Sequence, residues 1–440
     1  MARRLQTTDP DYEIAFGELL AQKREASQDI DDQVRQIIID IRKRGDAALF
    51  ELTKAFDRYD PATLPLRVTE VEIETAHANC DPELLKALNF AHDRITKHHI
   101  RQKPNDDIYK DHTGAELGHR WTPVSSVGLY VPGGTASYPS SVLMNTIPAK
   151  VAGVERIVMV VPAPDGRLNP LILAAAHIAG ASEIYRVGGA QAIAALAYGT
   201  ETIAPVDKIV GPGNAYVATA KRQVFGTVGI DSIAGPSEVL VIADKANNPE
   251  WIAADLLAQA EHDQAAQSIL MTDEKAFADA VESAVEQQLN SLPRKEIAAA
   301  SWRDFGAIIL LESLDEAAPL ADRIAAEHLE ISTADCEQLA ARIRHAGAIF
   351  LGPYTPEVIG DYVGGSNHVL PTARSARFSS GLGVLDFMKR TSILKLDRQA
   401  LDLLGPAAMI LAKSEGLDAH YRSVAIRLSG NDPDYNTKLP

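Results

Sequence analysis

The sequence has two cysteines, few aromatic residues and no long apolar run, and each shortage argues against a class of protein. Cys80 and Cys336 lie far apart and outside any Cys-x-x-Cys pattern, so neither a disulfide framework nor a thiolate zinc knuckle is indicated. No apolar run approaches the roughly 20 residues that span a bilayer. The polar residues 1–10 lack the apolar stretch of a signal peptide. We therefore expect a cytoplasmic protein with no membrane partner.

Positive charge is also scarce, because 43 Lys and Arg residues face 59 Asp and Glu residues and leave a net charge of −16. Such an acidic surface repels a phosphate backbone, and aromatic residues at 6% leave little for base stacking, so nucleic acid is not an expected partner. Hydrophobic residues at 46% are ordinary for a globular protein. A chain of 440 residues exceeds one hydrophobic core and predicts roughly two to four domains.

The N-terminal quarter has the pattern of a polar arm followed by helices. Residues 1–24 resemble an arm with one short apolar turn, and apolar residues recur at three- and four-residue steps between 31 and 56. Gly45 is a predicted helix stop within that segment, since basic residues precede it. A second helix is expected over 81–102.

Strand and helix patterns alternate along the rest of the chain. Between 127 and 244 we expect strands at 156–161, 183–187 and 207–210, and helices at 169–179, 190–198 and 214–225. Beyond 244 we expect helices at 249–261, 274–288 and 318–327, and strands at 268–271, 307–311, 329–332 and 348–351. This alternation predicts parallel βαβ units with helices on both sheet faces. An irregular glycine-rich stretch over 360–383 and a helical tail over 391–428 complete the pattern.

Two turns in the first α/β region share a layout that suits a nucleotide. Gly188-Gly189 and Gly211-Pro212-Gly213 each follow a predicted strand, and Gln191 and Asn214 stand at the following helix entrances. Ligands bind at the carboxyl ends of parallel strands, where glycine lets backbone amides approach and helix N-termini favour anions. The G-x-G-x-x-G fingerprint is absent, and glycines also make ordinary tight turns, so the pattern leaves both interpretations open.

Several scattered residues have the chemistry of a zinc site. Gln259 and His262 are three apart on a predicted helix and share a face. Asp361 and His368 lie in the glycine-rich stretch, and His420 follows a helix break at Gly416, with Asp418 expected to cap the last helix. Imidazole, carboxylate and amide oxygen are suitable zinc ligands. No short spacing links these residues, so a polar structural role for each histidine is the alternative.

Glu327 and His328 lie where a predicted helix gives way to a predicted strand. Neighbours inside a helix diverge by about 100° and could not serve one site, but a junction relaxes this restriction. A carboxylate that activates water beside an imidazole that moves protons suits oxidation through an aldehyde. Spacing alone favours the alternative of a solvated Glu–His pair.

Short motifs in order along the chain, from about residue 31 to 428, resemble the histidinol dehydrogenase family. The runs are Gly128 to Gly134, Val187 to Gln191, Gly211 to Asn214, Ile233 to Glu238, Ala258 to His262, Ala326 to Leu329, Asn367 to Thr372 and Glu415 to Leu417. The resemblance implies oxidation of L-histidinol through L-histidinal to L-histidine with NAD, the last steps of histidine biosynthesis. Zinc has no redox chemistry, so it would fix and polarise the substrate while NAD takes the electrons.

The resemblance also implies a role for individual residues. Glu327 would activate water and His328 would be the general base. One zinc ion per subunit would be bound by Gln259, His262, Asp361 and His420, and NAD by Tyr130, Gln191 and Asn214. The substrate would contact Ser237, Gln259, His262, His328, Asp361, His368, Glu415 and His420. The family is similar in forming a homodimer with shared active sites, so Glu415 and His420 would act across the interface.

The expected fold is α/β, with two doubly wound, incomplete Rossmann-like parallel-sheet domains and small helical N-terminal and C-terminal segments. We expect an N-terminal arm over 1–24, a first α/β domain over 25–129 and 240–378 with the zinc and catalytic residues, an NAD-binding domain over 130–239, and a C-terminal helical domain over 379–440. Alternatives are a zinc hydrolase, a non-catalytic metal- or nucleotide-binding scaffold, and a family relative that oxidises another polar alcohol.

Overall fold

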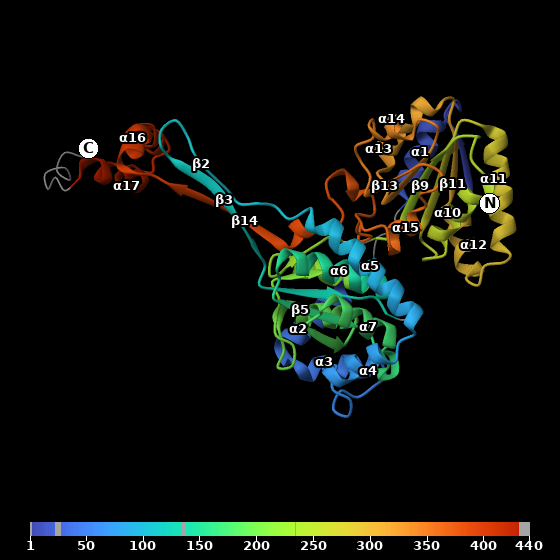
Figure 1. The fold of residues 1–440 in the computed structure, drawn as a ribbon, viewed down its shortest axis with the longest axis horizontal. Coiled ribbons are helices and arrows are strands. Elements are labelled where there is room, and N and C mark those ends of the chain that lie inside the picture. Colours follow the sequence, from blue (N-terminus) through green and yellow to red (C-terminus); the bar gives the residue numbers. More distant parts are fainter. Residues whose placement is uncertain (1, 23–27, 134–137, 234, 431–440) are drawn as a thin grey trace. The chain divides into compact units, whose positions relative to one another are not determined.

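The computed structural model describes residues 2–22, 28–133, 138–233 and 235–430. Within these ranges the strands form two parallel sheets and one antiparallel sheet, so the predicted α/β class is confirmed (Figure 1). The chain divides into a larger unit, Met1–Lys103 with Val124–Phe387, and a smaller unit, Pro104–Pro123 with Met388–Pro440. No helix in the described ranges is long and apolar enough to cross a membrane.

The first sheet of the larger unit has six strands in the order β1-β11-β10-β9-β12-β13, all paired in parallel. Its strands are β1 (Arg3–Gln6), β9 (Glu238–Ala243), β10 (Gln267–Thr272), β11 (Ala307–Leu310), β12 (His328–Ser332) and β13 (Ala348–Leu351). The accompanying helices are α1 (Tyr12–Ala21), α10 (Pro249–Ala260), α11 (Lys275–Leu289), α12 (Lys295–Asp304), α13 (Ala317–Ile324), α14 (Cys336–Ala340) and α15 (Glu357–Tyr362).

Helices cover both faces of this sheet because its central strands are apolar on both sides. In β9, Val239 and Val241 pack with α10, α11 and α12, whereas Leu240 and Ile242 pack with α1, α13 and α14. Successive side chains of a strand point to opposite faces, so a continuous apolar run needs a core on each side. This arrangement is the doubly wound one that the alternation predicts.

The N-terminal segment differs from the expected polar arm. Residues Arg3–Gln6 form the edge strand β1, which pairs with β11. Leu5 and the α1 residues Tyr12, Phe16 and Leu19 are buried in the core of the six-stranded sheet. The three apolar residues of α1 recur at three- and four-residue steps, so one face of the short helix buries them together.

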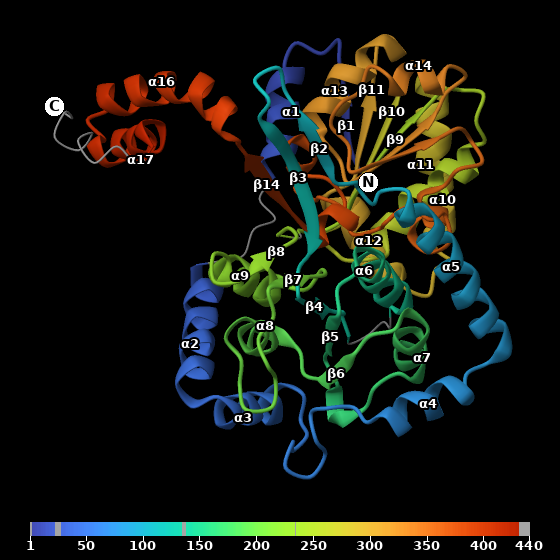
Figure 2. The same cartoon turned by 60° about the vertical axis from the view of Figure 1, so that its left-hand side comes forward.

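The second sheet of the larger unit has five parallel strands in the order β6-β5-β4-β7-β8. They are β4 (Ser126–Tyr130), β5 (Arg156–Val161), β6 (Glu183–Arg186), β7 (Lys208–Val210) and β8 (Gly229–Ile230). One face is covered by α2 (Gln28–Arg44), α3 (Asp46–Phe56), α8 (Gly189–Tyr198) and α9 (Ala215–Val224) (Figure 2). The other is covered by α4 (Glu70–Ala78), α5 (Pro82–Ile100), α6 (Pro139–Ala152) and α7 (Pro170–Ala179) (Figure 2).

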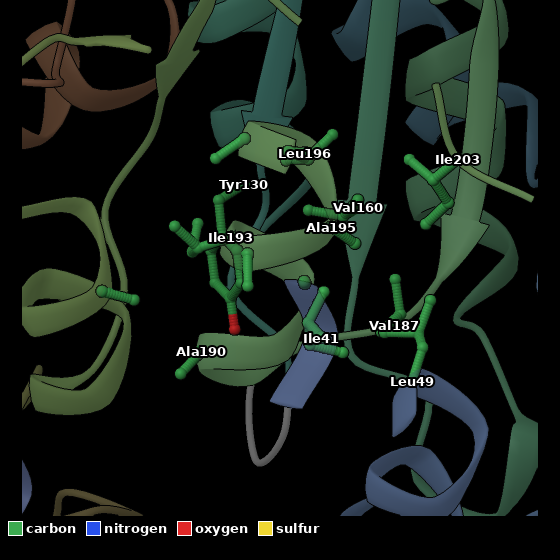
Figure 3. Packing of buried hydrophobic residues seen from close by; sticks show 14 of the residues in the cluster. Ile41, Leu49, Tyr130, Val160, Val187, Ala190, Ile193, Ala195, Leu196 and Ile203 are labelled. Carbon is green, nitrogen blue, oxygen red and sulfur yellow. The ribbon is translucent and has the colours of Figure 1, made fainter. Parts of the chain in front are cut away.

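The core of the five-stranded sheet contains helices that the sequence assigned to the other domain. Ile41 of α2 and Leu49 of α3 pack with Val160 of β5 and Ile193 of α8 (Figure 3). Residues 28–56 and β4 therefore belong with the five-stranded sheet, and not with 240–378 as expected. The predicted stop at Gly45 is confirmed, since this residue has a φ of 56° and separates α2 from α3.

The smaller unit contains an antiparallel sheet that the sequence did not predict. Its strands are β2 (Asp107–Lys110), β3 (Glu116–Pro123) and β14 (Met388–Lys395), in the order β14-β3-β2. The predicted helical tail is wrong over its first residues, because β14 pairs with β3 along its whole length. Two helices follow and pack on each other, α16 (Arg398–Ser414) and α17 (Asp418–Ser429).

The break between these two helices lies at Gly416, as predicted, with a φ of 71°. The expectation that Asp418 caps the last helix is wrong. Asp418 is the first residue of α17, and Leu417 occupies the cap position without a side-chain hydrogen bond. Elsewhere 3₁₀ turns occur at Pro164–Gly166, Leu314–Glu316, Ser375–Arg377 and Val384–Phe387.

Candidate active site

The Glu327–His328 pair lies at the junction of α13 and β12. Helix α13 ends at Ile324, three residues earlier than predicted, because Ala325 adopts a left-handed φ of 51° and turns the chain toward the strand. Glu327 and His328 are 5% and 3% exposed. The predicted helix-to-strand junction is confirmed, and the alternative of a solvated pair is wrong. Both residues lie at the amino end of β12, where a buried carboxylate and imidazole meet.

The ring of His328 has a defined orientation. Its Nδ1 lies 3.2 Å from the backbone oxygen of Glu238. A carbonyl oxygen only accepts hydrogen bonds, so this contact assigns the proton of the neutral ring to Nδ1. The other nitrogen, Nε2, is buried without a hydrogen-bond partner and lies 3.6 Å from Oδ1 of Asp361. In the neutral ring, Nε2 is therefore the nitrogen that can accept a proton, and it faces Asp361.

Burial and neighbouring charges shift the pKa values of this pair. Burial raises the pKa of Glu327 to about 7, although its Oε2 accepts a hydrogen bond of 3.0 Å from the amide of Glu238. Desolvation lowers the pKa of His328, but the carboxylates of Glu357 and Glu327 outweigh it and hold that pKa well above its usual value. Raised carboxyl pKa values of this kind are typical of groups that exchange protons near neutral pH.

Gln259 carries the clearest indication of a metal ligand. It lies in the last turn of α10, is fully buried, and neither its Oε1 nor its Nε2 has a hydrogen-bond partner. A buried amide without partners is unfavourable unless another group satisfies it, and a metal ion would satisfy the oxygen. His262 follows two residues after the helix end, where its amide donates to the carbonyl oxygen of Gln259 at 3.2 Å.

Asp361 lies in α15, and not in irregular chain as expected. Its side chain is 16% exposed and contacts His328. Burial raises the pKa of Asp361, but the interaction with the imidazole of His328 outweighs burial and lowers that pKa. The residue types fit zinc, which binds imidazole, carboxylate and amide oxygen. Among the described residues, no three His, Cys, Asp or Glu side chains group closely enough to hold a metal ion.

Two of the predicted substrate residues lie near this cluster. His368 is half-buried, and its Nδ1 lies 2.9 Å from the backbone oxygen of Asp361, while Nε2 lies 3.3 Å from Oγ of Ser141. Ser237 is half-buried and directly precedes β9, whose first residue contacts both Glu327 and His328. The larger unit thus gathers Glu327, His328, Asp361 and His368 through these contacts.

Glu415 and His420 belong to the smaller unit. Glu415 follows the last residue of α16 and His420 lies in the first turn of α17, and both are exposed. They stand on either side of the break at Gly416. The larger unit by itself supplies at most three of the four predicted zinc ligands.

The predicted cofactor residues lie at the centre of the five-stranded sheet. Tyr130 ends β4 and Asn214 precedes α9, which follows β7, the neighbour of β4. The sheet order reverses direction between β4 and β7, and such a switch point is where open α/β sheets bind ligands. The Tyr130 hydroxyl accepts a hydrogen bond from the amide of Gly189 at 3.0 Å, and Gln191 is 1% exposed. The three residues predicted to bind NAD therefore stand at or just after the carboxyl ends of strands β4, β6 and β7.

Asn214 has a structural task as well. Its side-chain oxygen accepts hydrogen bonds from the amides of Tyr216 and Val217 at 3.1 and 3.2 Å and so caps α9. The turn before it is held by a buried ion pair that the sequence analysis missed. Lys221 contacts Asp231 and donates to the carbonyl oxygen of Gly211 at 2.8 Å, while Asp231 accepts from the Gly211 amide at 2.8 Å.

Comparison with known proteins agrees over nearly the whole chain. A family model described as histidinol dehydrogenase matches residues 20–428. A curated histidinol dehydrogenase from Brucella abortus (strain 2308) is 68% identical over 98% of this chain and 100% of its own length. One from Mesorhizobium japonicum is 67% identical over the same shares. The chain belongs to the histidinol dehydrogenase family.

The family's fold agrees with the architecture described above. A crystal structure of histidinol dehydrogenase from Elizabethkingia anophelis is 37% identical and superposes with a TM-score of 0.92, over 97% of this chain and 98% of that one. The resemblance seen in the sequence motifs is thereby confirmed at the level of family and fold. Gly134 and Ala234, which stand in two of those motifs, lie outside the described residues.

A buried glutamate of this site carried no sequence signal. Glu357 opens α15 and is 1% exposed, and its Oε2 lies 3.5 Å from Nδ1 of His328. Burial raises the pKa of Glu357 to about 8. No spacing connects residue 357 to residue 328, because β13 and a loop separate them and only tertiary structure brings them together.

Proposed function

We propose that the protein oxidises L-histidinol through L-histidinal to L-histidine, with NAD accepting a hydride at each oxidation. This would make it the enzyme of the last two steps of histidine biosynthesis. The observation that carries the proposal is the buried Glu327–His328 pair, in which Nε2 of His328 has no hydrogen-bond partner and faces Asp361. Membership of the histidinol dehydrogenase family supports this substrate over a hydrolase or a non-catalytic scaffold.

A zinc ion, one per subunit, would be held by Gln259, His262, Asp361 and His420. The unpartnered amide of Gln259 supports this assignment, since a buried oxygen without a hydrogen bond is available to a cation. When bound, zinc would polarise the substrate and hold its oxygen without taking part in electron transfer.

In the first oxidation, His328 would take the hydroxyl proton on Nε2 while the alcohol carbon loses its hydride. The O–H and C–H bonds break, a C=O bond forms, and the electron pair leaves with the hydride to the nicotinamide. Nδ1 keeps its proton because it faces the backbone oxygen of Glu238. Because this contact fixes the orientation of the His328 ring, the base need not reorient in the transition state.

In the second oxidation, Glu327 would take a proton from water as the water oxygen adds to the aldehyde. The resulting hydrate can lose a second hydride, and His328 would again accept a hydroxyl proton. The position of Glu327 beside His328 supports this division, since Oε2 lies 3.8 Å from Nδ1. Burial of the pair would keep the reactive aldehyde away from bulk water between the two steps.

NAD would bind at the five-stranded sheet through Tyr130, Gln191 and Asn214. Glycines 188, 189 and 211 stand at the strand ends and permit close approach of a phosphate group to backbone amides. Ser237, His368 and Glu415 would contact the amino alcohol and its imidazole ring. Together with the larger unit's zinc ligands and His328, these residues complete the proposed substrate contacts.

The active sites would be shared within a homodimer, with Glu415 and His420 acting in the site of the partner subunit. The smaller unit supports this, because large apolar side chains of α16 are exposed in the single chain, among them Leu403 at 60%, Ile410 at 70% and Leu411 at 61%. Apolar surface of this kind is typical of a protein interface. We place the enzyme in the cytoplasm, consistent with its two unpaired cysteines.

Single-turnover formation of NADH tests the chemical assignments. Glu327→Gln should slow oxidation of histidinal far more than that of histidinol, by roughly 10²- to 10⁴-fold, the contribution of a general base. His328→Asn should impair both oxidations. Equal losses on the two substrates for Glu327→Gln would contradict the proposed role of Glu327. Oxidation of another amino alcohol in preference to histidinol would contradict the substrate.

Mixed dimers test the shared site. Chains with His420→Ala and chains with Glu327→Gln, each slow to form histidine alone, should recover histidine formation when refolded together, because one site of the mixed dimer has neither defect. Mixed dimers that form without any recovery would show that His420 serves its own subunit.

A further inference from the structure

Helix α15 places two carboxylates against the two nitrogens of one imidazole. Glu357 and Asp361 lie one helical turn apart and therefore on one face of the helix. Oε2 of Glu357 lies 3.5 Å from Nδ1 of His328, and Oδ1 of Asp361 lies 3.6 Å from Nε2. Asp361 has a task in the proposed zinc site, whereas Glu357 has none in the mechanism given above.

Glu357 is held in place by groups that do not use its Oε2. Its amide donates a hydrogen bond of 2.6 Å to Oε1 of Glu330 in β12, which fixes the start of α15. Its Oε2 is buried without a hydrogen-bond partner. A buried carboxyl oxygen is unfavourable without a polar neighbour, and Nδ1 of His328 lies 3.5 Å from it.

Aromatic packing closes the remaining side of this arrangement. The ring of Phe350 in β13 lies 6.1 Å from the ring of His328. Gly360, between the two carboxylates on α15, lies against Phe350 so closely that a Cβ atom there would meet its Cε1 at 2.5 Å. The absence of a side chain at residue 360 therefore lets α15 approach β13, which brings Glu357 within reach of His328.

We infer that Glu357 is a positioning residue for His328, which keeps the imidazole oriented with its proton on Nδ1 and its Nε2 toward the substrate. The inference rests on the proposed function, in which His328 is the general base. Glu357 is not among the proposed substrate or cofactor contacts, so it would act through His328.

The chemistry follows from what surrounds Nδ1. The backbone oxygen of Glu238 lies 3.2 Å from Nδ1 and Oε2 of Glu357 lies 3.5 Å from it, and both atoms are acceptors, so a proton on Nδ1 is favoured. When Nε2 takes the hydroxyl proton, the O–H bond breaks, an N–H bond forms and the ring becomes an imidazolium. That positive charge forms 3.5 Å from Oε2 of Glu357, and an acceptor oxygen at this distance stabilises the imidazolium more than it stabilises the neutral ring. Such differential stabilisation accelerates the step.

The test is Glu357→Gln in the zinc-loaded enzyme. The variant keeps the size of the side chain but loses the charge, and its amide can donate to Nδ1 and turn the ring proton to the wrong nitrogen. We expect kcat to fall roughly 10- to 100-fold on both histidinol and histidinal, the range for carboxylates that orient functional histidines. KM for histidinol should change by less than about twofold, because a group that acts in the transition state leaves ground-state binding unchanged.

Two further variants separate positioning from general damage. Glu330→Gln also removes a buried carboxylate next to α15 but keeps an oxygen that accepts the Glu357 amide, so its kcat should stay near the wild-type value. Glu357→Asp keeps the charge on a shorter side chain and should recover part of the kcat lost in Glu357→Gln. Zinc content, measured by atomic absorption, should be equal in all variants.

Several outcomes would overturn the inference. They are an unchanged kcat in Glu357→Gln, an equal loss in Glu330→Gln, a lower kcat in Glu357→Asp than in Glu357→Gln, or loss of zinc from Glu357→Gln. The last would mean that Glu357 acts through Asp361. The His328→Asn variant distinguishes a failure of this inference from a failure of the proposed function. If His328→Asn retains full activity, His328 is not the base, whereas an inactive His328→Asn beside a fully active Glu357→Gln refutes the positioning role alone.

Discussion

In the two parallel sheets of the larger unit, the residues of the proposed sites stand at opposite edges. In the five-stranded sheet, Tyr130 and Asn214 stand at the carboxyl ends of β4 and β7. In the six-stranded sheet, His328 and Glu238 stand at the amino ends of β12 and β9, and Gln259 lies at the carboxyl end of a helix. Two sheets of the same parallel α/β architecture therefore carry polar residues at edges of different chemistry, the carboxyl edge in one sheet and the amino edge in the other.

Helix direction explains the difference. In a parallel sheet the helices run opposite to the strands, so helix N-termini lie at the carboxyl edge and helix C-termini at the amino edge. N-termini carry partial positive charge and favour a phosphate, whereas C-termini carry partial negative charge and favour a cation. The carboxyl edge of the five-stranded sheet thus suits an anionic dinucleotide, and the amino edge of the six-stranded sheet suits zinc and an imidazolium.

The largest effect should come from removing a proposed zinc ligand at the amino edge. Asp361→Ala should reduce zinc content and lower turnover by at least about 100-fold, since a metal ion contributes several kcal/mol of transition-state stabilisation. Affinity for NAD should stay unchanged, because the proposed NAD site lies at the other sheet. Zinc analysis and NAD titration of the same preparation check this, and full zinc with normal turnover would refute the ligand assignment.

At the carboxyl edge, the corresponding change is Lys221→Met. It leaves the buried Asp231 carboxylate without its partner and should destabilise the protein by about 3 to 5 kcal/mol. Because the pair holds both backbone groups of Gly211, NAD affinity should also fall while zinc content stays constant. Chemical denaturation and NAD titration measure both effects. Lys221→Met with Asp231→Asn should recover part of the stability, and a double variant as unstable as the single one would contradict the ion-pair argument.

The free energy of unfolding should also depend on pH through Glu327, which lies at the amino edge of the six-stranded sheet. Burial raises the pKa of Glu327 from 4.5 to about 7, so its contribution to stability is complete below pH 4.5 and is lost as pH rises through 7. Between pH 4.5 and 8, the free energy of unfolding of the metal-free wild type should therefore fall by up to about 3 kcal/mol relative to that of Glu327→Gln. Denaturation of both metal-free proteins across this range checks the sign, and a difference independent of pH would refute it.

The smallest effect concerns the two tasks of Asn214. Asn214→Ala removes the cap of α9 and should cost about 1 kcal/mol of stability. Asn214→Ser keeps a capping oxygen but not the amide, so it should retain stability and still lose NAD affinity. Equal NAD affinity in Asn214→Ser and wild type would leave Asn214 with the capping task alone.

Much of the fold could be predicted because the central strands are continuously apolar. The strand expected at 156–161 is β5 residue for residue, and Asn169, the first residue of the next predicted helix, is the cap of α7. Strands β2 and β14 escaped prediction because they are mostly exposed and polar and lack the alternation that a core imposes. Domain boundaries were missed at α2 and α3, whose helical pattern does not indicate which sheet they cover.

The candidate site could be predicted only in part, because most of its residues are brought together by tertiary structure and leave no local pattern in the sequence. Glu327 and His328 are adjacent in the sequence, so a helix-to-strand junction could be recognised from local pattern. The proposed zinc ligands come from segments that no local spacing connects, and the family resemblance supplied that set. Glu357 had neither signal, because its relation to His328 exists only after β13 and α15 have packed.

Strand β1 has a consequence for how the chain is assembled during synthesis. The strand leaves the ribosome first, yet its partner β11 is made late, since Arg3 pairs with Ala307. All strands of the five-stranded sheet, from Ser126 to Ile230, emerge between the two. One sheet can therefore fold on the nascent chain while Phe16 and Leu19 of α1 still lack the surface that buries them. Until β11 appears, the apolar side chains of the N-terminal segment remain exposed, which is the condition under which large proteins aggregate during folding.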